Sequence, residues 1–278
     1  MQTCVITLYS GENEFTDLKK SLDNQQYQDF DHEVYRYLPN KKAFQTVYST
    51  VMKNEGGYDL FVRVDADMVL NKITSLGFIV NCFIANDELD HAIFPVYDVL
   101  SQRRILGMHA YTPRARWPNL DEKLFVDPIP EVDGQSSIIP NTPSKLILHS
   151  PNPSNYQAFY FGYHRTLKAK TIKYGAKLSQ SLIQWGTIYG VYRRYIKTGQ
   201  TKSLFCCLGV CDALRGELSH LSSDNKKEVL KSSFNDYSEK SRSELEEVVD
   251  DILPYYFGCL GSIGEMYYSL HKATWYLR

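Results

Sequence analysis

The first 64 residues alternate between patterns typical of strands and patterns typical of helices. Apolar, β-branched runs at 4–9, 32–38 and 58–64 are predicted to be strands, and the stretches at 14–24 and 42–53 carry apolar residues at helical spacing. A strand that returns to pair in parallel needs a long crossover, which a helix supplies. The order therefore predicts an α/β fold of the Rossmann-like kind, with a mainly parallel sheet flanked by helices.

Further strands and long loops are expected up to about residue 165. A helix is predicted at 73–83, and strands are predicted at 92–97, 105–111 and 145–149. The segment between the last two strands is rich in Pro and Asn, which is typical of long loops that carry function.

Beyond residue 165 only helical spacing recurs. An apolar stripe with steps of three and four residues consists of Leu178, Leu182, Trp185, Tyr189, Tyr192 and Ile196. The sequence thus predicts an α/β domain at 1–165, followed by a helical C-terminal region at 166–278.

The composition excludes several classes of protein. Hydrophobic residues make up 43% and charged residues 23% of the chain, which is typical of a globular protein and not of a disordered or fibrous one. Lys and Arg (31) balance Asp and Glu (32), which argues against a nucleic-acid-binding protein. Six cysteines are too few for a disulfide scaffold, and Cys206, Cys207 and Cys211 lack the paired spacing of a zinc site.

We expect a reduced, cytoplasmic protein. The first residues enter a strand pattern without the basic segment and cleavage site of a signal peptide. No window holds 18 uninterrupted apolar residues, the length that a membrane-spanning helix needs.

Two aspartates follow directly on the third predicted strand. Asp65 and Asp67 end an apolar run, whereas the other Asp-x-Asp pair, Asp29 and Asp31, lies in a polar loop. Ligands of open α/β sheets bind at the carboxyl ends of the strands, and two such carboxylates can supply hard oxygen ligands to Mg²⁺ or Mn²⁺. The ion would bridge a diphosphate and stabilise a leaving group. The alternative is a pair of capping aspartates at a strand-to-helix turn.

The chain resembles nucleotide-sugar glycosyltransferases of the GT-A fold, close to the family 2-like group. The resemblance rests on the opening segment CVITLYSGENEF, on the β-α-β-α-β order and on VRVDADMVL as a DxD motif, and it covers residues 1–165. It implies that Asp67 binds the metal and that Asp65 contacts the ribose or the metal.

The same resemblance implies a nucleotide site around the motif. Its expected members are Tyr9, Ser10 and Glu12 after the first strand, Pro39 and Asn40 after the second, and Arg63 and Ala66 within the motif. Many relatives have an aspartate at the end of the second strand that reads uracil, where this chain has Pro39 and Asn40. A UDP-sugar is the favoured donor, with the identity of the base left open.

His149 is a candidate third ligand. It ends a predicted apolar strand, and GT-A enzymes often place a late histidine near the metal. A neutral imidazole suits Mn²⁺ better than Mg²⁺, while the alternative is a histidine that is satisfied within the core or a loop. Further along, His164, Arg165 and Lys168 would stabilise the departing diphosphate, or else they form an ordinary basic start of a helix.

An inverting transferase needs a carboxylate that takes the proton from the acceptor hydroxyl. The acidic residues between the DxD motif and His149 include Asp98, Asp127, Glu131 and Asp133. Asp127 and then Asp133 are preferred, because they lie in the loop-rich region expected to receive the acceptor. Family 2-like enzymes mostly invert, so the resemblance favours inversion; the alternative for each carboxylate is that it only faces solvent.

A basic segment opens the helical region. Residues 165–202 hold nine Lys or Arg and no Asp or Glu, whereas residues 217–251 hold ten acidic and five basic residues. A basic, aromatic helix can lie on an anionic membrane surface, which suits a transferase that acts on a lipid-linked acceptor. The alternative is that the basic segment packs against the acidic helices of the same region.

Together these features predict a metal-dependent glycosyltransferase. It would move a sugar from a nucleoside diphosphate to a hydroxyl of a glycan or lipid-linked acceptor, in surface polysaccharide biosynthesis and at the inner face of the membrane. Two alternatives stay open: a nucleotidyltransferase acting on a sugar phosphate, and a non-catalytic GT-A-like binding protein.

A nucleotidyltransferase should carry a Gly-rich phosphate loop with a lysine after the first strand, and YSGENEF lacks both. Intact Asp65, Asp67 and His149 argue against a non-catalytic relative.

Overall fold

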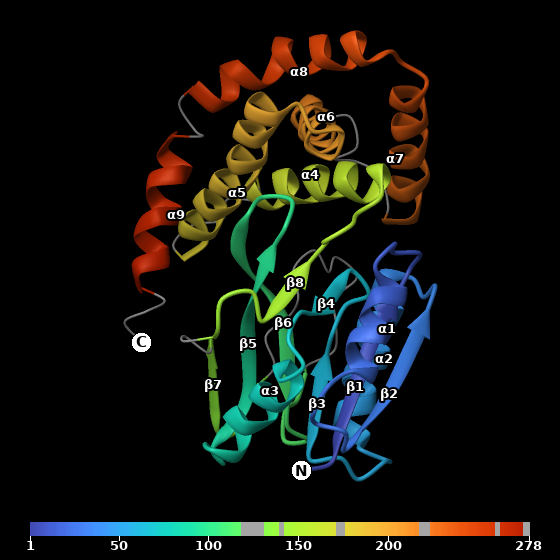
Figure 1. The fold of residues 1–278 in the computed structure, drawn as a ribbon, viewed down its shortest axis with the longest axis vertical. Coiled ribbons are helices and arrows are strands. Elements are labelled where there is room, and N and C mark those ends of the chain that lie inside the picture. Colours follow the sequence, from blue (N-terminus) through green and yellow to red (C-terminus); the bar gives the residue numbers. More distant parts are fainter. Residues whose placement is uncertain (118–130, 139–141, 171–175, 217–222, 259–261, 275–278) are drawn as a thin grey trace. The chain divides into compact units, whose positions relative to one another are not determined.

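The computed structural model describes residues 1–117, 131–138, 142–170, 176–216, 223–258 and 262–274. The chain forms two compact units (Figure 1). The first contains Met1–Val99 and Arg104–Asn152, and the second contains Leu100–Arg103 and Pro153–Arg278. The predicted boundary at residue 165 lies within helix α4 (Asn155–Lys170), which belongs to the second unit.

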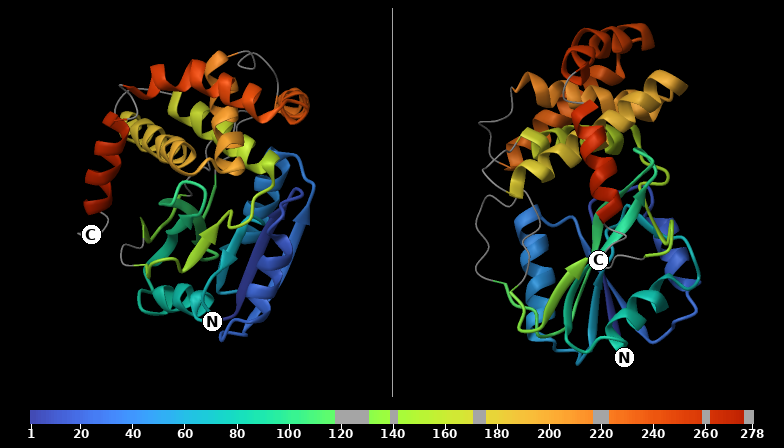
Figure 2. Two further views of the ribbon diagram at one scale, coloured as in Figure 1. Left: turned by 45° about the horizontal axis from the view of Figure 1, so that its top comes forward. Right: turned by 90° about the vertical axis from the view of Figure 1, so that its left-hand side faces the viewer.

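The first unit begins with the predicted alternation of strands and helices. It runs through β1 (Thr3–Tyr9), α1 (Phe15–Asp23), β2 (Phe30–Arg36), α2 (Asn40–Lys53) and β3 (Leu60–Arg63), and β1 pairs in parallel with both β2 and β3. Val5 of β1 packs with α1, whereas its neighbours Cys4 and Ile6 pack with α2. Because successive residues of a strand point to opposite faces, the two helices cover opposite sides of the sheet (Figure 2). The prediction of an α/β fold with flanking helices is confirmed.

The sheet as a whole is mixed, so the prediction of a mainly parallel sheet is wrong. After α3 (Ser75–Ile84), the neighbouring strands β5 (Leu89–Asp98) and β6 (Arg103–Tyr111) are joined only by residues 99–102. Strands joined by so short a loop must run antiparallel. β6 also pairs antiparallel with β3.

Two short strands that the sequence did not predict complete the sheet. β4 (Met68–Leu70) pairs antiparallel with β8 (Ile147–His149), while β7 (Gln135–Ile138) and β8 pair in parallel with successive parts of β5. The strand order is β2-β1-β3-β6-β5-β8-β4, with β7 also beside β5.

The turn after β3 forces this sheet to curl. β3 and β4 are consecutive in the chain but stand four strand positions apart in the sheet, which would require about 19 Å if the sheet were flat. The chain from Arg63 to Met68 could span about 18 Å only if it were fully extended. It is instead folded into a turn, in which the Met68 N–H donates to the Asp65 carbonyl at 2.9 Å. The sheet must therefore curl until the ends of β3 and β4 meet.

The second unit is built from helices, as the sequence predicts. Beside α4, the described residues form α5 (Ala176–Thr198), α6 (Thr201–Arg215), α7 (Ser223–Ser238), α8 (Arg242–Tyr256) and α9 (Ser262–Thr274). Two glycines let α4 and α6 pack closely. A Cβ atom on Gly162 would lie 2.0 Å from the Cys206 carbonyl oxygen, and one on Gly209 would lie 1.9 Å from that of Phe159.

The apolar stripe predicted on α5 faces the core of this unit in its middle and solvent at its ends. Trp185 is 5% exposed, whereas Ile196 is 60% exposed. In the part of the chain that the structure describes, no helix has both the length and the apolar character needed to cross a membrane.

Gly209→Ala is expected to destabilise the helical unit by about 1–3 kcal/mol, because the added methyl group would push α4 and α6 apart. Gly258→Ala is the matched control, since nothing lies within 4 Å of a Cβ atom built there. Urea unfolding followed by circular dichroism measures both variants. Equal unfolding midpoints for Gly209→Ala and the wild type would contradict the close packing of these helices.

Candidate functional site

His149 lies between two carboxylates at the point where three strands meet. It ends β8, opposite Met68 on β4 and opposite Asp98 on β5. Its Nε2 atom lies 3.3 Å from Oδ2 of Asp67, and its Nδ1 atom lies 2.7 Å from Oδ1 of Asp98. The backbone supports this arrangement, because the Ser150 N–H donates to the Asp67 carbonyl at 2.7 Å. We call Asp67, Asp98 and His149 the imidazole cluster.

The two carboxylates set the protonation of the imidazole. His149 is 9% exposed, and Asp98 is fully buried. Burial alone would lower the pKa of His149, but the adjacent Asp67 and Asp98 outweigh that effect and raise the pKa to about 10. Without an ion the ring therefore favours the protonated form, with an N–H toward each carboxylate. A metal ion at Nε2 would take the place of the proton on that nitrogen.

The spacing on the Asp67 side of this cluster is compatible with the predicted divalent ion, which stays a prediction. Two ligands at right angles, each about 2.1 Å from Mg²⁺, lie about 3 Å apart, close to the 3.3 Å between Asp67 Oδ2 and His149 Nε2. A metal-binding histidine commonly donates its other N–H to a carboxylate, as His149 does to Asp98. Mg²⁺ and Mn²⁺ at phosphate sites take one or two protein carboxylates together with substrate oxygens. Among the described residues, no three His, Cys, Asp or Glu side chains form a complete metal site.

Asp65 has a different partner. Its Oδ1 atom lies 3.3 Å from Nε of Arg63, a buried arginine that is 2% exposed. The Arg63 guanidinium also lies 5.2 Å from the centroid of the Phe44 ring on α2. The Asp65 side chain itself is 34% exposed. A buried cation thus fixes the direction of a carboxylate that solvent can still reach.

The predicted nucleotide residues lie along the same edge of the sheet. The Ala66 N–H donates to the Leu8 carbonyl at 3.3 Å, which continues the parallel pairing of β1 and β3 and places the loop after β1 beside the motif. Within that loop, Glu12 accepts hydrogen bonds from the backbone N–H and the hydroxyl of Ser10. Asn40 is the first residue of α2, the helix that follows β2.

An aromatic cluster flanks the loop after β1, and sequence reasoning missed it. The Tyr9 ring centroid lies 4.5 Å from that of Phe15 and 5.3 Å from that of Tyr37. Tyr37 is 67% exposed, and its N–H donates to the Tyr9 carbonyl at 2.8 Å. The Arg36 guanidinium lies 5.1 Å from the Tyr9 ring centroid. Exposed rings beside a cation form a surface on which a nucleotide base can stack.

The residues of the predicted phosphate clamp lie on α4 of the second unit. The His164 ring stacks with that of Tyr160 at a centroid distance of 5.7 Å. Arg165 donates to Oε1 of Gln184 at 3.0 Å, and Lys168 lies one turn beyond His164. These contacts are all within the helical unit, and the clamp stays a prediction.

Other basic side chains of the segment 165–202 also bond within the helical unit. Lys170 donates to the Ala213 carbonyl at 2.8 Å, and Arg194 donates to the Leu100 carbonyl at 3.2 Å. Arg193 is exposed. Part of the segment therefore stabilises its own unit, and the membrane surface stays a prediction.

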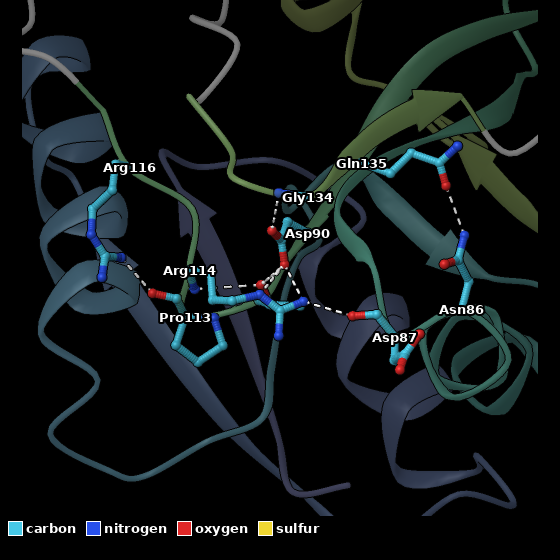
Figure 3. A network of polar contacts seen from close by, with 9 residues as sticks. Asn86, Asp87, Asp90, Pro113, Arg114, Arg116, Gly134 and Gln135 are labelled. Carbon is cyan, nitrogen blue, oxygen red and sulfur yellow. Dashed lines mark hydrogen bonds and ion pairs between the residues drawn. The ribbon is translucent and has the colours of Figure 1, made fainter.

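The structure describes only one of the two candidate bases. Asp127 lies outside the described residues. Asp133 is exposed and precedes Gly134, whose N–H donates to Oδ2 of Asp90 at 2.8 Å (Figure 3). Asp90 lies near the start of β5 and Asp98 at its end, roughly 26 Å away along an extended strand. The structure does not bring Asp133 to the imidazole cluster.

The hydrogen bonds around Asp90 explain its burial. Arg114 Nε donates to its Oδ1 atom at 2.5 Å (Figure 3). The Thr112 hydroxyl donates to the same atom at 2.7 Å. Burial alone would raise the pKa of Asp90, but these bonds, the Gly134 N–H and the charge of Arg114 outweigh it and lower the pKa. Asp90 is thus a structural carboxylate whose charge is compensated.

Asp98 is the functional candidate whose role sequence reasoning missed. The sequence presented it only as one of several possible bases, whereas the structure shows that it binds His149. Its position contained a usable signal, because Asp98 closely follows the predicted strand at 92–97 much as Asp65 follows the one at 58–64.

Comparisons with known proteins leave the family open. No protein-family model matches the chain, and no curated protein matches its sequence. Among solved structures, the chain is similar to A197 from STIV, with 12% sequence identity and a TM-score of 0.30. That match covers 40% of this chain and 65% of the other, less than two thirds of its length. A similarity of this size assigns neither a fold nor a function.

Asp90→Asn is expected to lower the free energy of unfolding by about 2 kcal/mol at pH 7, because it removes the charge from a buried, arginine-bonded carboxylate. The pKa of Asp90 is lower in the folded protein than in the unfolded chain. Its stabilisation is therefore present above about pH 4 and is lost as the pH falls through the folded-state value. Urea midpoints of variant and wild type should converge between pH 7 and pH 3; a gap that widens toward pH 3 would contradict this.

Proposed function

We propose that the chain is a metal-dependent glycosyltransferase whose first unit is GT-A-like and whose donor is a nucleoside-diphosphate sugar. The observation that carries the proposal is the imidazole cluster. It joins the second aspartate of the motif to His149 with Nε2 facing the carboxylate at 3.3 Å. The cluster lies where β4, β8 and β5 meet, and the turn that bears the motif continues β3 beside β1, the edge at which α/β sheets bind ligands.

Each residue of this edge has a role in the proposal. An ion held by Asp67 and His149 would neutralise charge on the diphosphate as it leaves. Asp98 is a positioning residue, because its bond to Nδ1 keeps Nε2 of His149 directed at Asp67. Asp65, directed by Arg63, offers a second carboxylate to the ribose or to the ion.

The loop after β1 supports a nucleotide as the ligand. The half-buried Tyr9 and the exposed Tyr37 offer rings for stacking, and the Ser10–Glu12 turn follows Tyr9 in the chain and leads to α1. A UDP-sugar stays the favoured donor and a glycan or lipid-linked hydroxyl the favoured acceptor. We propose no residue as the base.

A thermal-shift screen with UDP-, GDP-, CMP- and dTDP-sugars, each with and without Mn²⁺, tests the proposal. At least one nucleotide sugar should raise Tm only when the ion is present, because a ligand that binds the folded state stabilises it. Asp67→Ala should abolish that ion-dependent shift, because it removes the carboxylate that faces His149.

Asp29→Ala is the matched control for this screen. Asp29 belongs to the other Asp-x-Asp pair and precedes β2, at the opposite end of the strand from the proposed site. It should keep the full shift. The proposal fails if no nucleotide sugar gives an ion-dependent shift or if Asp67→Ala retains one. A shift with a nucleoside triphosphate and a sugar phosphate, but with no nucleotide sugar, would favour the nucleotidyltransferase.

Asp98→Asn is expected to weaken ion-dependent binding of the same nucleotide sugar by at least about tenfold, because the histidine loses the carboxylate that orients it. Isothermal titration calorimetry with Mn²⁺ measures the change in Kd. Asp90→Asn, the same substitution near the other end of β5, should leave Kd unchanged in protein that remains folded. Wild-type affinity in Asp98→Asn would refute the positioning role.

A further inference from the structure

A concave site lies in the first unit, beside α2 and β2. It has a volume of about 540 Å³, and its lining comes from β2, α2, the turn after α2 and the start of β3. That volume is within the ~300–1,000 Å³ of small-molecule sites. Its lining includes the buried Phe61 and the half-buried Tyr35 and Tyr58. None of the residues of the imidazole cluster contributes to it.

One face of α2 supplies a continuous polar wall. The lining positions on this helix are spaced by three, one, three, one and three residues, which is a single helical stripe: Lys42, Gln45, Thr46, Ser49, Thr50 and Lys53. The opposite face of the same helix packs into the core through Val47, Tyr48 and Val51. The wall therefore presents amide and hydroxyl groups in its middle and an ammonium group at each end.

Both tyrosine rings are held in place through their hydroxyl groups. Tyr35 donates to Oε2 of Glu33 at 2.6 Å, and its oxygen lies 2.8 Å from the Thr50 hydroxyl. Tyr58 donates to Oδ2 of Asp31 at 2.8 Å. Each ring packs partly against the core and stays partly exposed. Because both rings are already held in place, a ligand that stacks on their exposed parts would cost little further side-chain entropy.

The turn after α2 is shaped around Tyr58. Asn54 adopts a left-handed conformation (φ 47°), and its side chain bonds both the N–H and the carbonyl of Tyr58, at 2.8 and 3.0 Å. A Cβ atom on Gly56 would lie 2.2 Å from Cε2 of the Tyr58 ring. The turn thus combines a residue that tolerates the left-handed region with a glycine that leaves room for the ring.

The charges around this site cancel. Lys42 and Lys53 on the helix are matched by Glu33 on β2 and Glu55 on the turn, with Lys53 Nζ 3.9 Å from Glu55 Oε1. An anionic or cationic ligand would meet a like charge as well as an opposite one. A neutral ligand with many hydroxyl groups would meet hydrogen-bonding partners along the wall and ring faces for its C–H groups.

We propose that this groove is a binding site for a neutral oligosaccharide, separate from the nucleotide-sugar site. The fixed tyrosine rings would stack against sugar C–H faces, and Gln45 and Ser49 would bond sugar hydroxyls. The site needs neither a nucleotide nor an ion, so it stands or falls independently of the proposed transferase activity.

Saturation-transfer difference NMR with maltotriose, cellotriose, chitotriose and mannotriose, in the absence of nucleotide and Mn²⁺, tests the proposal. At least one trisaccharide should bind, and calorimetry should show at least a tenfold higher Kd for the double variant Gln45→Ala/Ser49→Ala. Both side chains are exposed, so the variant should fold as the wild type does. Thr16→Ala/Lys20→Ala, at exposed positions of α1, is the matched control and should bind normally.

Asp67→Ala separates this groove from the proposed nucleotide-sugar site. It should leave trisaccharide binding unchanged while abolishing the ion-dependent nucleotide shift. The proposal is overturned if none of the four trisaccharides binds, if Gln45→Ala/Ser49→Ala binds as well as the wild type, or if Asp67→Ala weakens binding. Tighter binding of a charged hyaluronan fragment than of every neutral trisaccharide would overturn it as well.

Discussion

A buried imidazole held between two carboxylates is the interaction on which the candidate site depends. Burying a charge is costly unless it is paired, and His149 reaches that pairing only where Asp67 and Asp98 approach it from either side. The three residues come from segments that are far apart in the chain, so their pairing joins β4, β8 and β5 at one point. The same geometry that balances the buried charge also directs one nitrogen of the ring at the second aspartate of the motif.

The contact between Asp67 and His149 depends on the curl of the sheet. The motif turn leaves β3 and enters β4 without enough chain to cross a flat sheet, so β4 must come round to β8. Only in that curled arrangement does Met68 lie opposite His149, which brings the adjacent Asp67 to Nε2. The antiparallel pairing of β4 with β8 thus brings the two candidate ligands together. The mixed strand order is therefore a condition of the site.

Local patterns predicted the part of the fold that local interactions determine. The alternation up to Arg63 has strong apolar periodicity in every element, and β1, α1, β2, α2 and β3 form as expected. β4 and β7 are three and four residues long, too short for any periodic signal, and their pairing is decided by distant partners. The antiparallel course of β5 and β6 could have been inferred, because the gap between the predicted strands leaves no room for a crossover. Among site residues, Asp67 and His149 were accessible as strand-ending polar residues, whereas the clustering of Tyr37 with Tyr9 depends on a left-handed backbone (φ 53°) that the sequence does not display.

The two aspartates of β5 show why residue type and loop location are weak guides to function. Asp90 accepts hydrogen bonds from Arg114, Thr112 and Gly134. These bonds compensate its charge and link β5 to the segments that carry the three donors. Asp98, on the same strand and equally buried, instead binds a ring whose other nitrogen faces a partly exposed carboxylate. The difference lies in the second contact of each partner. Arg114 also donates to the Asp87 backbone carbonyl, whereas His149 directs its other nitrogen at the side chain of Asp67. A buried carboxylate therefore becomes a functional candidate when its partner still has a donor or acceptor directed at a group that a ligand can reach.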